Sequence, residues 1–275
     1  MTLQPLSGIM NVKEKNGGLG MKLLFIGDVV GSAGVAFVKE KLWKLKRDYE
    51  IDLTVINGEN SAQGNGITPE SFGELMRIGA DVVTTGNHCF RRKEMSACYE
   101  REPLLLRPAN YPEGVVGRGS CTVDLGRARV AVINLMGTAY MDSLDNPFTV
   151  IDSILPEIDT PNIIVDFHAE ATAEKKAMGF YLDGRVTAVL GTHTHVQTAD
   201  EAVLAGGTAY ITDAGMTGPE VSVLGVESSI AIEKMRLRHP VTFRESSSAC
   251  FLNGVVVTFD EKTGRAGAIE RLIIR

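Results

Sequence analysis

The sequence predicts an α/β protein in which one domain is built on a mixed two-sheet core. From Met21 onward, short apolar runs alternate with stretches of helical periodicity, as in βαβ units with parallel strands. The middle and the last third of the chain add patterns that are typical of antiparallel hairpins. The chain has 275 residues, of which 44% are hydrophobic, so it is long enough to bury such a core without disulfides.

The first half of the chain predicts a βαβαβ unit. Continuous apolar runs, which suit strands buried on both faces, predict strands over 22–27, 52–57 and 81–86. Helical spacing of apolar residues predicts helices over about 33–47, 69–78 and 91–100. The second of these helices has the clearest start, because Thr68 is a hydroxyl N-cap and Pro69 occupies the first helical position.

The second half mixes hairpins with further strand and helix patterns. Two apolar runs between Cys121 and Asn134 flank Arg127 and predict a hairpin. Helices are expected over about 148–157 and 169–182, and buried strands over 163–167 and 186–191. The chain after Thr198 is expected to be rich in strands, with a last hairpin turn at 261–264. Residues 1–20 are polar and glycine-rich and are expected to form a flexible N-terminal extension before a domain over 21–275.

Composition excludes several classes of protein. The formal net charge of -6 argues against a surface that coats nucleic acid, which would need an excess of basic residues. The four cysteines form no CxxC pair and are expected to be reduced thiols. No apolar run approaches the roughly 18 residues of a membrane span, and no signal peptide is apparent. We therefore expect a cytoplasmic protein that has no membrane contact and no stable nucleic-acid partner.

Polar side chains with metal-binding chemistry follow nearly every predicted buried strand. The carboxyl ends of parallel strands meet at one edge of a sheet, where ligands bind in open α/β folds. Imidazole nitrogens and hard oxygens are metal ligands, and this set contains no thiolate. The residues at these strand ends are Asp28, Glu59, Asn60, Asn87, His88, His168, His193 and His195.

These candidate ligands outnumber those that a single metal ion binds. We therefore expect two metal ions, bridged by the Glu59 carboxylate. Taken singly, each residue has a structural alternative: Asp28 is a common helix N-cap and Asn60 a common turn residue. The coincidence of all of them at strand ends favours the metal site. Two acidic residues that follow His168, Glu170 and Glu174, are expected to be helix-start charges rather than ligands.

The ordered motifs resemble those of the calcineurin-like metallophosphoesterases. They run GD at 27–28, GEN at 58–60, GNH at 86–88, a lone histidine at 168 and GTHTH at 191–195. The chain departs from the usual pattern, because GDVV contains no histidine and Glu59 stands where an aspartate is usual. In addition, Cys89 follows GNH in place of an acid, and Thr192 precedes the first histidine of the last motif. These departures, together with RPANYP and DAGMTGP, resemble the YmdB-like branch of cyclic-nucleotide phosphodiesterases.

The resemblance implies a four-layer α/β/β/α sandwich with two central mixed β-sheets and a dinuclear centre. Iron is the first expectation for its metal, with manganese or zinc as alternatives. One ion would be held by Asp28, Glu59, Asn60 and one of the two terminal histidines, which are His193 and His195 of the last motif.

The other ion would be held by Glu59, Asn87, His168 and the second terminal histidine. His195 would join Asp28 by analogy, and His88 would stand beside the centre as a proton donor without binding metal.

The expected function is hydrolysis of small phosphodiesters, foremost 2′,3′-cyclic nucleotides, by hydroxide generated at the metals with His88 protonating the leaving oxygen. A phosphomonoesterase or small nuclease on the same centre is the alternative with related chemistry. A dinuclear amidohydrolase is disfavoured because its paired histidines usually come on the first strand. A metal-containing regulatory protein with weak activity is the non-enzyme alternative. The resemblance also suggests a homo-oligomer.

Overall fold

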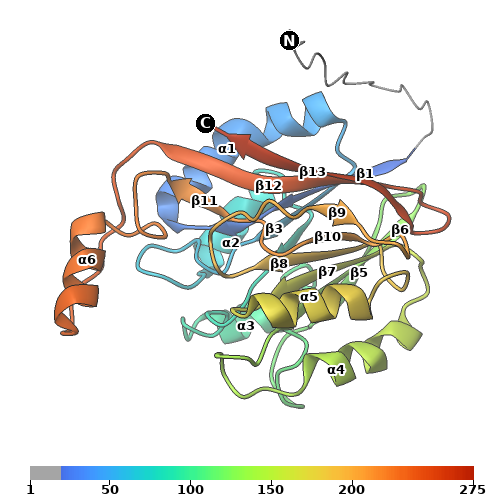
Figure 1. Cartoon of the computed structure of the whole chain (residues 1–275), viewed down its shortest axis with the longest axis horizontal. Helices are drawn as coiled ribbons and strands as arrows, with labels where there is room; N and C mark the ends of the chain where they lie inside the picture. Colours follow the sequence, from blue (N-terminus) through green and yellow to red (C-terminus); the bar gives the residue numbers. More distant parts are fainter. Residues whose placement is uncertain (1–19) are drawn as a thin grey trace, which may run out of the picture.

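The computed structural model describes residues 20–275, which form two β-sheets flanked by helices (Figure 1). The expected flexible extension over 1–20 lies outside the described residues, apart from Gly20. The first sheet is 7-stranded, with the order β2-β11-β12-β1-β3-β4 and with β13 paired to β12. Its strands are β1 (Met21–Ile26), β2 (Asp28–Val29), β3 (Leu53–Asn57), β4 (Val82–Thr84), β11 (Met216–Pro219), β12 (Cys250–Phe259) and β13 (Ala266–Ile274).

The second sheet is 6-stranded, with the order β5-β6-β7-β8-β10-β9. Its central strands β6, β7, β8 and β10 run parallel, and β5 and β9 are antiparallel edges. In the first sheet, β1, β3 and β4 are parallel, whereas β12 is antiparallel to β1. The strands of the second sheet are β5 (Ser120–Asp124), β6 (Arg129–Met136), β7 (Ile163–His168), β8 (Ala188–Thr192), β9 (Ala202–Val203) and β10 (Ala209–Ile211).

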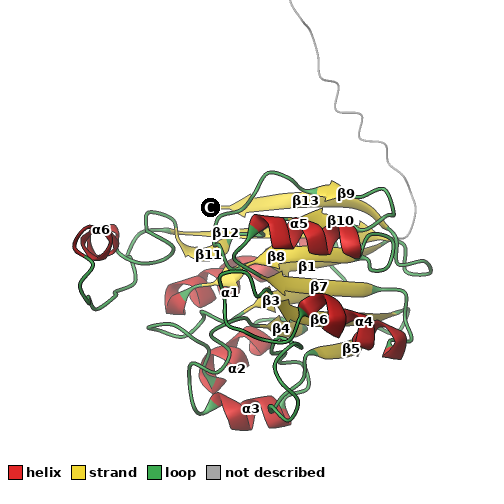
Figure 2. Ribbon diagram, turned by 60° about the horizontal axis from the view of Figure 1, so that its bottom comes forward, coloured by secondary structure: helices red, strands yellow, loops and turns green. Residues whose placement is uncertain are grey.

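Three apolar cores separate four layers, which confirms the expected α/β/β/α sandwich (Figure 2). One core lies between the first sheet and α1, α2 and α3, one between the two sheets, and one between the second sheet and α4 and α5. The helices are α1 (Gly31–Tyr49), α2 (Pro69–Arg77), α3 (Met95–Arg101), α4 (Pro147–Ile154) with a 3-10 turn over Leu155–Glu157, and α5 (Thr172–Tyr181).

Strand β1 shows why a continuous apolar run forms a central strand here. Leu24 and Ile26 face the helical core, whereas Leu23 and Phe25 face the core between the sheets. Alternate side chains of a strand point to opposite faces, so a strand covered on both sides must be apolar at every position. Burying one such side chain stabilises the folded state by about 1.5–3 kcal/mol relative to leaving it exposed to water.

The predicted start of α2 is confirmed in detail. The Thr68 side chain accepts from the Ser71 backbone N–H, and the Ser71 hydroxyl accepts from the Thr68 backbone N–H. This reciprocal capping box satisfies two backbone donors of the first turn, and Pro69 occupies its first position. The predicted hairpins around Arg127 and at 261–264 are confirmed as well, by the antiparallel pairs β5–β6 and β12–β13.

Two elements were not foreseen. A helix, α6 (Ser228–Leu237), lies in the region expected to hold strands, and both views show it apart from the sheets (Figures 1 and 2). Ile232, Met235 and Leu237 of α6 are largely exposed, so its sequence lacks the buried apolar stripe that would mark a helix. The second element is β2, which carries Asp28 and pairs with β11 instead of simply ending the first strand.

Within residues 20–275, no helix is both long enough and apolar enough to cross a lipid bilayer.

Candidate metal centre

The side chains predicted from the strand ends converge around Glu59, which is fully buried just beyond β3. Its Oε1 lies 3.0 Å from Asn60 Nδ2, 3.2 Å from His88 Nδ1 and 3.3 Å from His168 Nε2. Its Oε2 accepts from the His88 backbone N–H at 3.1 Å. Glu59 therefore contacts residues from both sheets, as the expected bridging carboxylate must.

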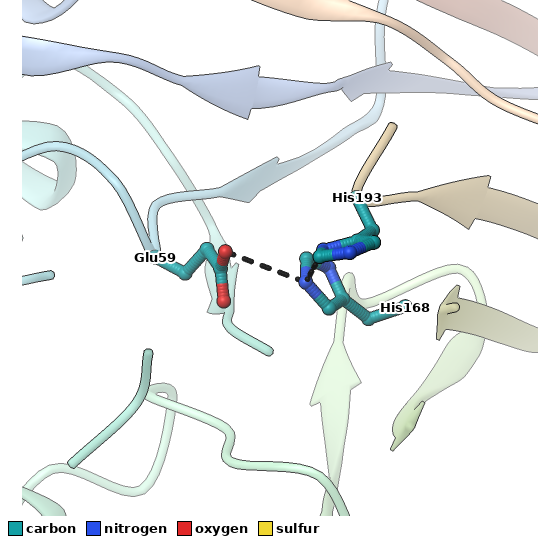
Figure 3. Close-up of side chains that lie close together, drawn as sticks. All are labelled: Glu59, His168 and His193. Atoms are coloured by element: carbon teal, nitrogen blue, oxygen red, sulfur yellow. Dashed lines mark hydrogen bonds and ion pairs between the residues drawn. The ribbon is translucent and has the colours of Figure 1, made fainter. Parts of the chain in front are cut away.

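One group of ligand atoms gathers beside Glu59 at the ends of β4, β7 and β8. His168 Nε2 lies 3.0 Å from Asn87 Oδ1 and 3.1 Å from His193 Nδ1. Figure 3 shows the Glu59 carboxylate and the two imidazoles facing one another. Ligand atoms of Glu59, His168 and His193 all lie within 4.8 Å of one another, which makes this group a candidate metal site.

A second group lies on the β2 side of Glu59. His195 Nε2 lies 3.7 Å from Asp28 Oδ1 and 3.3 Å from Asn60 Nδ2. Asp28 Oδ2 accepts from the His193 backbone N–H at 3.0 Å. The two terminal histidines thus diverge: His195 lies with Asp28 and Asn60, and His193 lies with His168.

The residues present fit two metal ions. Asp28 Oδ1 is buried and has no hydrogen-bond partner within residues 20–275, although a buried carboxylate oxygen normally has one. His168 Nε2 faces the oxygens of Asn87 and Glu59 and a nitrogen of His193, an arrangement that a cation would satisfy. The ligand set consists of nitrogen and oxygen atoms without sulfur, which suits iron, manganese or zinc.

The electrostatics of the centre also favour a cation. Burial raises the pKa of Glu59, but His168 and His88 outweigh burial and hold that pKa well below its usual value. Burial lowers the pKa of His168, yet the Glu59 carboxylate outweighs burial and raises it to about 9. The pKa of His193 falls to about 3 because of burial and of the neighbouring His168. The buried Glu59 carboxylate thus favours a cation beside it, which is the charge that a bound metal ion would supply.

His88 stands beside the centre with its two ring nitrogens in different surroundings. Nδ1 lies 3.2 Å from Glu59 Oε1 and 3.1 Å from Asn60 Oδ1. Nε2 points away from Glu59 and lies 3.3 Å from Asn65 Nδ2. The His88 side chain is 25% exposed to solvent, whereas the side chains of His168 and Glu59 are fully buried. This position suits a proton donor that meets a substrate.

Asp166, in the interior of β7, was not among the predicted site residues, and it orients His168 through the Thr192 hydroxyl. The Thr192 hydroxyl donates to Asp166 Oδ1 at 2.7 Å and lies 2.9 Å from His168 Nδ1. Asn57 donates to Asp166 Oδ2 at 2.9 Å. Such outer partners fix the tautomer of a ligating histidine and leave its other nitrogen free for metal. A charged residue inside the otherwise apolar run IIVDF was the signal that could have revealed Asp166.

A second missed group holds the loop that carries the terminal histidines. Asp213 Oδ2 accepts from the backbone N–H of Thr194 at 3.0 Å and from its hydroxyl at 2.7 Å. Lys175 Nζ lies 2.6 Å from the same oxygen, and both side chains are buried. The backbones of His193 and His195 are left-handed, with φ of 101° and 64°, so this loop needs firm anchoring.

Gly86 is required by the close approach of the GNH turn to His168. A Cβ at Gly86 would lie 2.1 Å from His168 Cδ2, which no side chain can accept. Only glycine, which lacks a side chain, allows the GNH turn to lie this close to His168.

Glu174 lies in the first turn of α5, as expected, and Glu170 lies directly before the N-cap of that helix. Glu170 Oε2 also lies 3.0 Å from His193 Nε2, a contact with the candidate centre that was not predicted. The Glu174 carboxylate accepts from the backbone N–H groups of Thr138 and Ala139. Spacing along the chain could not predict either contact, because both depend on how β6 and β8 lie beside β7.

Comparison with known proteins places these features in a family. Residues 24–272 match the family described as YmdB-like protein. A 2′,3′-cyclic-nucleotide 2′-phosphodiesterase of Bacillus subtilis is 48% identical over 256 residues, which cover 92% of this chain and 97% of that protein. The enzyme class of that relative, a phosphoric diester hydrolase, is the class that the sequence predicts.

Solved structures agree with the fold. A protein from Thermus thermophilus, described as hypothetical, superimposes with a TM-score of 0.87 at 39% identity and covers 92% of this chain and 98% of its own. A phosphatase from Mycoplasma pneumoniae superimposes with a TM-score of 0.88 at 35% identity and covers 93% of each chain. The order of motifs, the two-sheet fold and these matches agree, and the chain belongs to the YmdB-like family of metallophosphoesterases.

Proposed function

We propose that this chain is a dinuclear-metal phosphodiesterase that hydrolyses small phosphodiesters, foremost 2′,3′-cyclic nucleotides. The observation that carries the proposal is the convergence of ligand side chains from both sheets on Glu59, with His88 at their exposed side. The Bacillus subtilis relative, a 2′,3′-cyclic-nucleotide 2′-phosphodiesterase, supports the choice of substrate class.

In the proposed centre, Asp28, Asn60 and His195 would hold one ion, Asn87, His168 and His193 would hold the other, and Glu59 would contribute to both sites. When bound, the ions supply Lewis acidity, which makes water available as a nucleophile at neutral pH and neutralises charge on the phosphate oxygens. We propose iron first and manganese or zinc as alternatives, because the ligand set contains no thiolate.

The remaining chemistry belongs to the chain itself. His88 gives a proton from Nε2 to the leaving oxygen, a contribution of about 10²–10⁴ in rate for a well-placed general acid. Glu59 and Asn60 accept from Nδ1 and keep the ring in the required orientation. Asp166 and Thr192 keep His168 Nε2 directed into the centre.

A cavity beside His195 supports a nucleotide as the substrate. It has a volume of about 280 Å³, and its lining includes Phe251, Asn253, Arg271 and Arg275. An aromatic ring, an amide and two guanidinium groups are the groups that stack on a base and bind phosphate.

Turnover of 2′,3′-cyclic AMP by protein loaded with Mn²⁺ or Fe²⁺ tests the proposal. We expect adenosine 3′-phosphate as the product, separated by chromatography, and little release of phosphate from adenosine 3′-phosphate itself. Faster hydrolysis of the monoester would favour the phosphomonoesterase alternative. Turnover no higher than that of His88→Ala would favour a regulatory protein.

A further inference from the structure

We propose that the cavity beside His195 is a subsite for the base of the substrate, and that it selects bases with an amino group, adenine foremost. Its volume of about 280 Å³ lies just below the range of about 300–1,000 Å³ for pockets that enclose whole drug-sized ligands, so it fits one part of a nucleotide. His195 is a proposed metal ligand, and a 2′,3′-cyclic nucleotide carries its base one ribose ring away from its phosphate. The inference rests on the proposed function, and the experiments below separate a failure of one from a failure of the other.

One wall of the cavity is a face of β12 whose polarity changes along the strand. Leu252 packs into the core between the first sheet and its helices. Because successive side chains of a strand point to opposite faces, Phe251 and Asn253 share the other face, and both line the cavity. Farther along that face, Val255 packs into the apolar core between the sheets. Asn253 is therefore a buried polar residue at the point where the face changes from core to cavity wall.

Two amide oxygens at this wall lack the hydrogen bonds that buried oxygens normally make. Asn253 is 4% exposed, and its Oδ1 has no hydrogen-bond partner within residues 20–275. The same is true of Gln197 Oε1 in this part of the chain. The Gln197 amide cannot turn over to correct this, because its Nε2 donates to the carbonyls of Ala214 and Gly254 at 3.2 and 3.0 Å. Both oxygens are acceptors that a bound donor would satisfy.

The two amide side chains meet at Gly215. This residue has a φ of 81°, and a Cβ on it would lie 2.6 Å from Asn253 Nδ2 and 2.9 Å from Gln197 Cβ. Glycine is needed here for the left-handed backbone and for the space that its missing side chain leaves. Because the two amides share this space, they can bind the same polar edge of one ligand.

An amino base carries groups that are complementary to these amides. The exocyclic amine of adenine has two N–H donors, and the ring nitrogen beside it is an acceptor. Asparagine and glutamine amides pair with such an edge of adenine through two hydrogen bonds. In hypoxanthine a carbonyl oxygen replaces the amine, so the oxygens of Gln197 and Asn253 would face another acceptor. The cavity wall should therefore discriminate between a 6-amino and a 6-oxo purine.

The rest of the lining favours a neutral ring over a second phosphate group. Phe251 supplies an aromatic surface, on which any base can stack. The guanidinium group of Arg271 is ion-paired with Glu201 at 2.6 Å, and that of Arg275 with Glu220 at 2.7 Å. These carboxylates match the guanidinium charges, whereas the planar groups can still stack on a base.

The 2′,3′-cyclic phosphates of adenosine and inosine test the proposal, because their bases differ in the amine and the adjacent ring nitrogen. We expect Mn²⁺-loaded wild type to show a kcat/KM about 10-fold to 100-fold higher for the adenosine compound. Asn253→Ala should remove most of this preference, with the larger loss on the adenosine compound, since the inosine compound lacks the amine. Equal kcat/KM values in wild type, or a preference that survives in Asn253→Ala, would overturn the proposal.

Two further variants separate recognition of the amine from other effects. Asn162→Ala is the matched control, because Asn162 is 1% exposed and also has an unpartnered Oδ1, but lies before the first residue of β7, away from the strand end that carries His168. It should keep the preference, and a lost preference would attribute the effect to stability and overturn the assignment. Phe251→Leu should lower kcat/KM for both compounds by similar factors, because stacking does not depend on the amine.

Calorimetric titration with the 3′-phosphates of adenosine and inosine gives a readout that does not depend on turnover. Wild type should bind adenosine 3′-phosphate about ten-fold more tightly than inosine 3′-phosphate, and Asn253→Ala should lose the difference. This binding pattern without turnover of either cyclic nucleotide would support the base subsite and contradict the proposed function. Turnover without a base preference would overturn the base subsite and leave the proposed function standing.

Discussion

Replacing Thr192 with valine removes a hydroxyl that links two buried groups of the centre and keeps the side chain's size and shape. The Thr192 hydroxyl donates to Asp166 Oδ1 at 2.7 Å and lies 2.9 Å from His168 Nδ1. All three side chains are fully buried, so water cannot replace the lost contacts. The variant therefore leaves the His168 ring without its orienting acceptor.

The expected magnitude follows from these contacts. Asp166 Oδ1 and His168 Nδ1 lose a close partner, and each unsatisfied buried atom costs about 1–3 kcal/mol. Asn57 Nδ2 loses only a longer contact at 3.4 Å and keeps its bond to Asp166 Oδ2. Asp166 Oδ2 still accepts hydrogen bonds from Asn57 and Thr84. The free-energy cost at the Asp166 carboxylate should therefore lie near the lower end of that range. For the metal, loss of such an outer partner weakens binding about 10-fold to 100-fold.

The dissociation constant for Mn²⁺, measured by competition with a chromophoric chelator, is the primary assay. Urea unfolding of the metal-free protein measures the loss of stability separately. The matched control is Thr187→Val, because Thr187 is also buried, and its hydroxyl accepts from the Ile163 backbone N–H at 3.0 Å outside the centre. We expect Thr187→Val to lower stability and leave the Mn²⁺ dissociation constant unchanged. Equal Mn²⁺ affinity in Thr192→Val and wild type would refute the orienting role.

Three further predictions concern the centre and its support. His88→Ala should keep both metals and lose about 10²–10⁴ in turnover of 2′,3′-cyclic AMP; an emptied site by elemental analysis would contradict its assignment as a proton donor. Glu59→Gln should lower the occupancy of both ions, and two full equivalents in that variant would show that Glu59 is not the bridge. Lys175→Met should lower the urea-derived free energy of unfolding by about 3–5 kcal/mol, because it leaves buried Asp213 without its cation. Lys176→Met, at a half-exposed ion pair, should lower it by less than about 1 kcal/mol, and equal losses would contradict the buried-pair argument.

Local patterns were sufficient for most of the fold. The run at 22–27 and the Thr68-Pro69 start each express a local rule, and the structure confirms both within a residue. The helix α6 escaped prediction because its large apolar side chains Ile232, Met235 and Leu237 are exposed and Ala231 is its one buried residue, so the helix presents little contrast between a buried and an exposed face. A periodic pattern of apolar residues indicates a helix when one face of that helix is buried. A helix that buries little surface has no such pattern and is not predicted from it.

The ligand candidates could be named from the sequence because their placement follows from topology. Parallel strands bring their carboxyl ends to one edge of each sheet, which gathers Glu59 with Asn87 in the first sheet and His168 with His193 in the second. The packing of one sheet on the other then brings Glu59 Oε1 within 3.3 Å of His168 Nε2. Spacing along the chain left open which of His193 and His195 joins which group, and only the family resemblance placed His195 with Asp28, where it lies in the structure. The side to which His193 and His195 each turn depends on two left-handed residues in one loop, which the local sequence does not specify.

The sequence by itself determined the class of chemistry: nitrogen and oxygen ligands at strand ends, a histidine beside them, and a fold that gathers them. Only the tertiary structure decided how those side chains are held. Asp166 and Asp213 hold the centre through contacts with Thr192 and Thr194, which lie on strands and loops that are distant in the chain. Ligand identity is a local property of residue type and strand position, whereas orientation depends on long-range hydrogen bonds that form only when both sheets have packed.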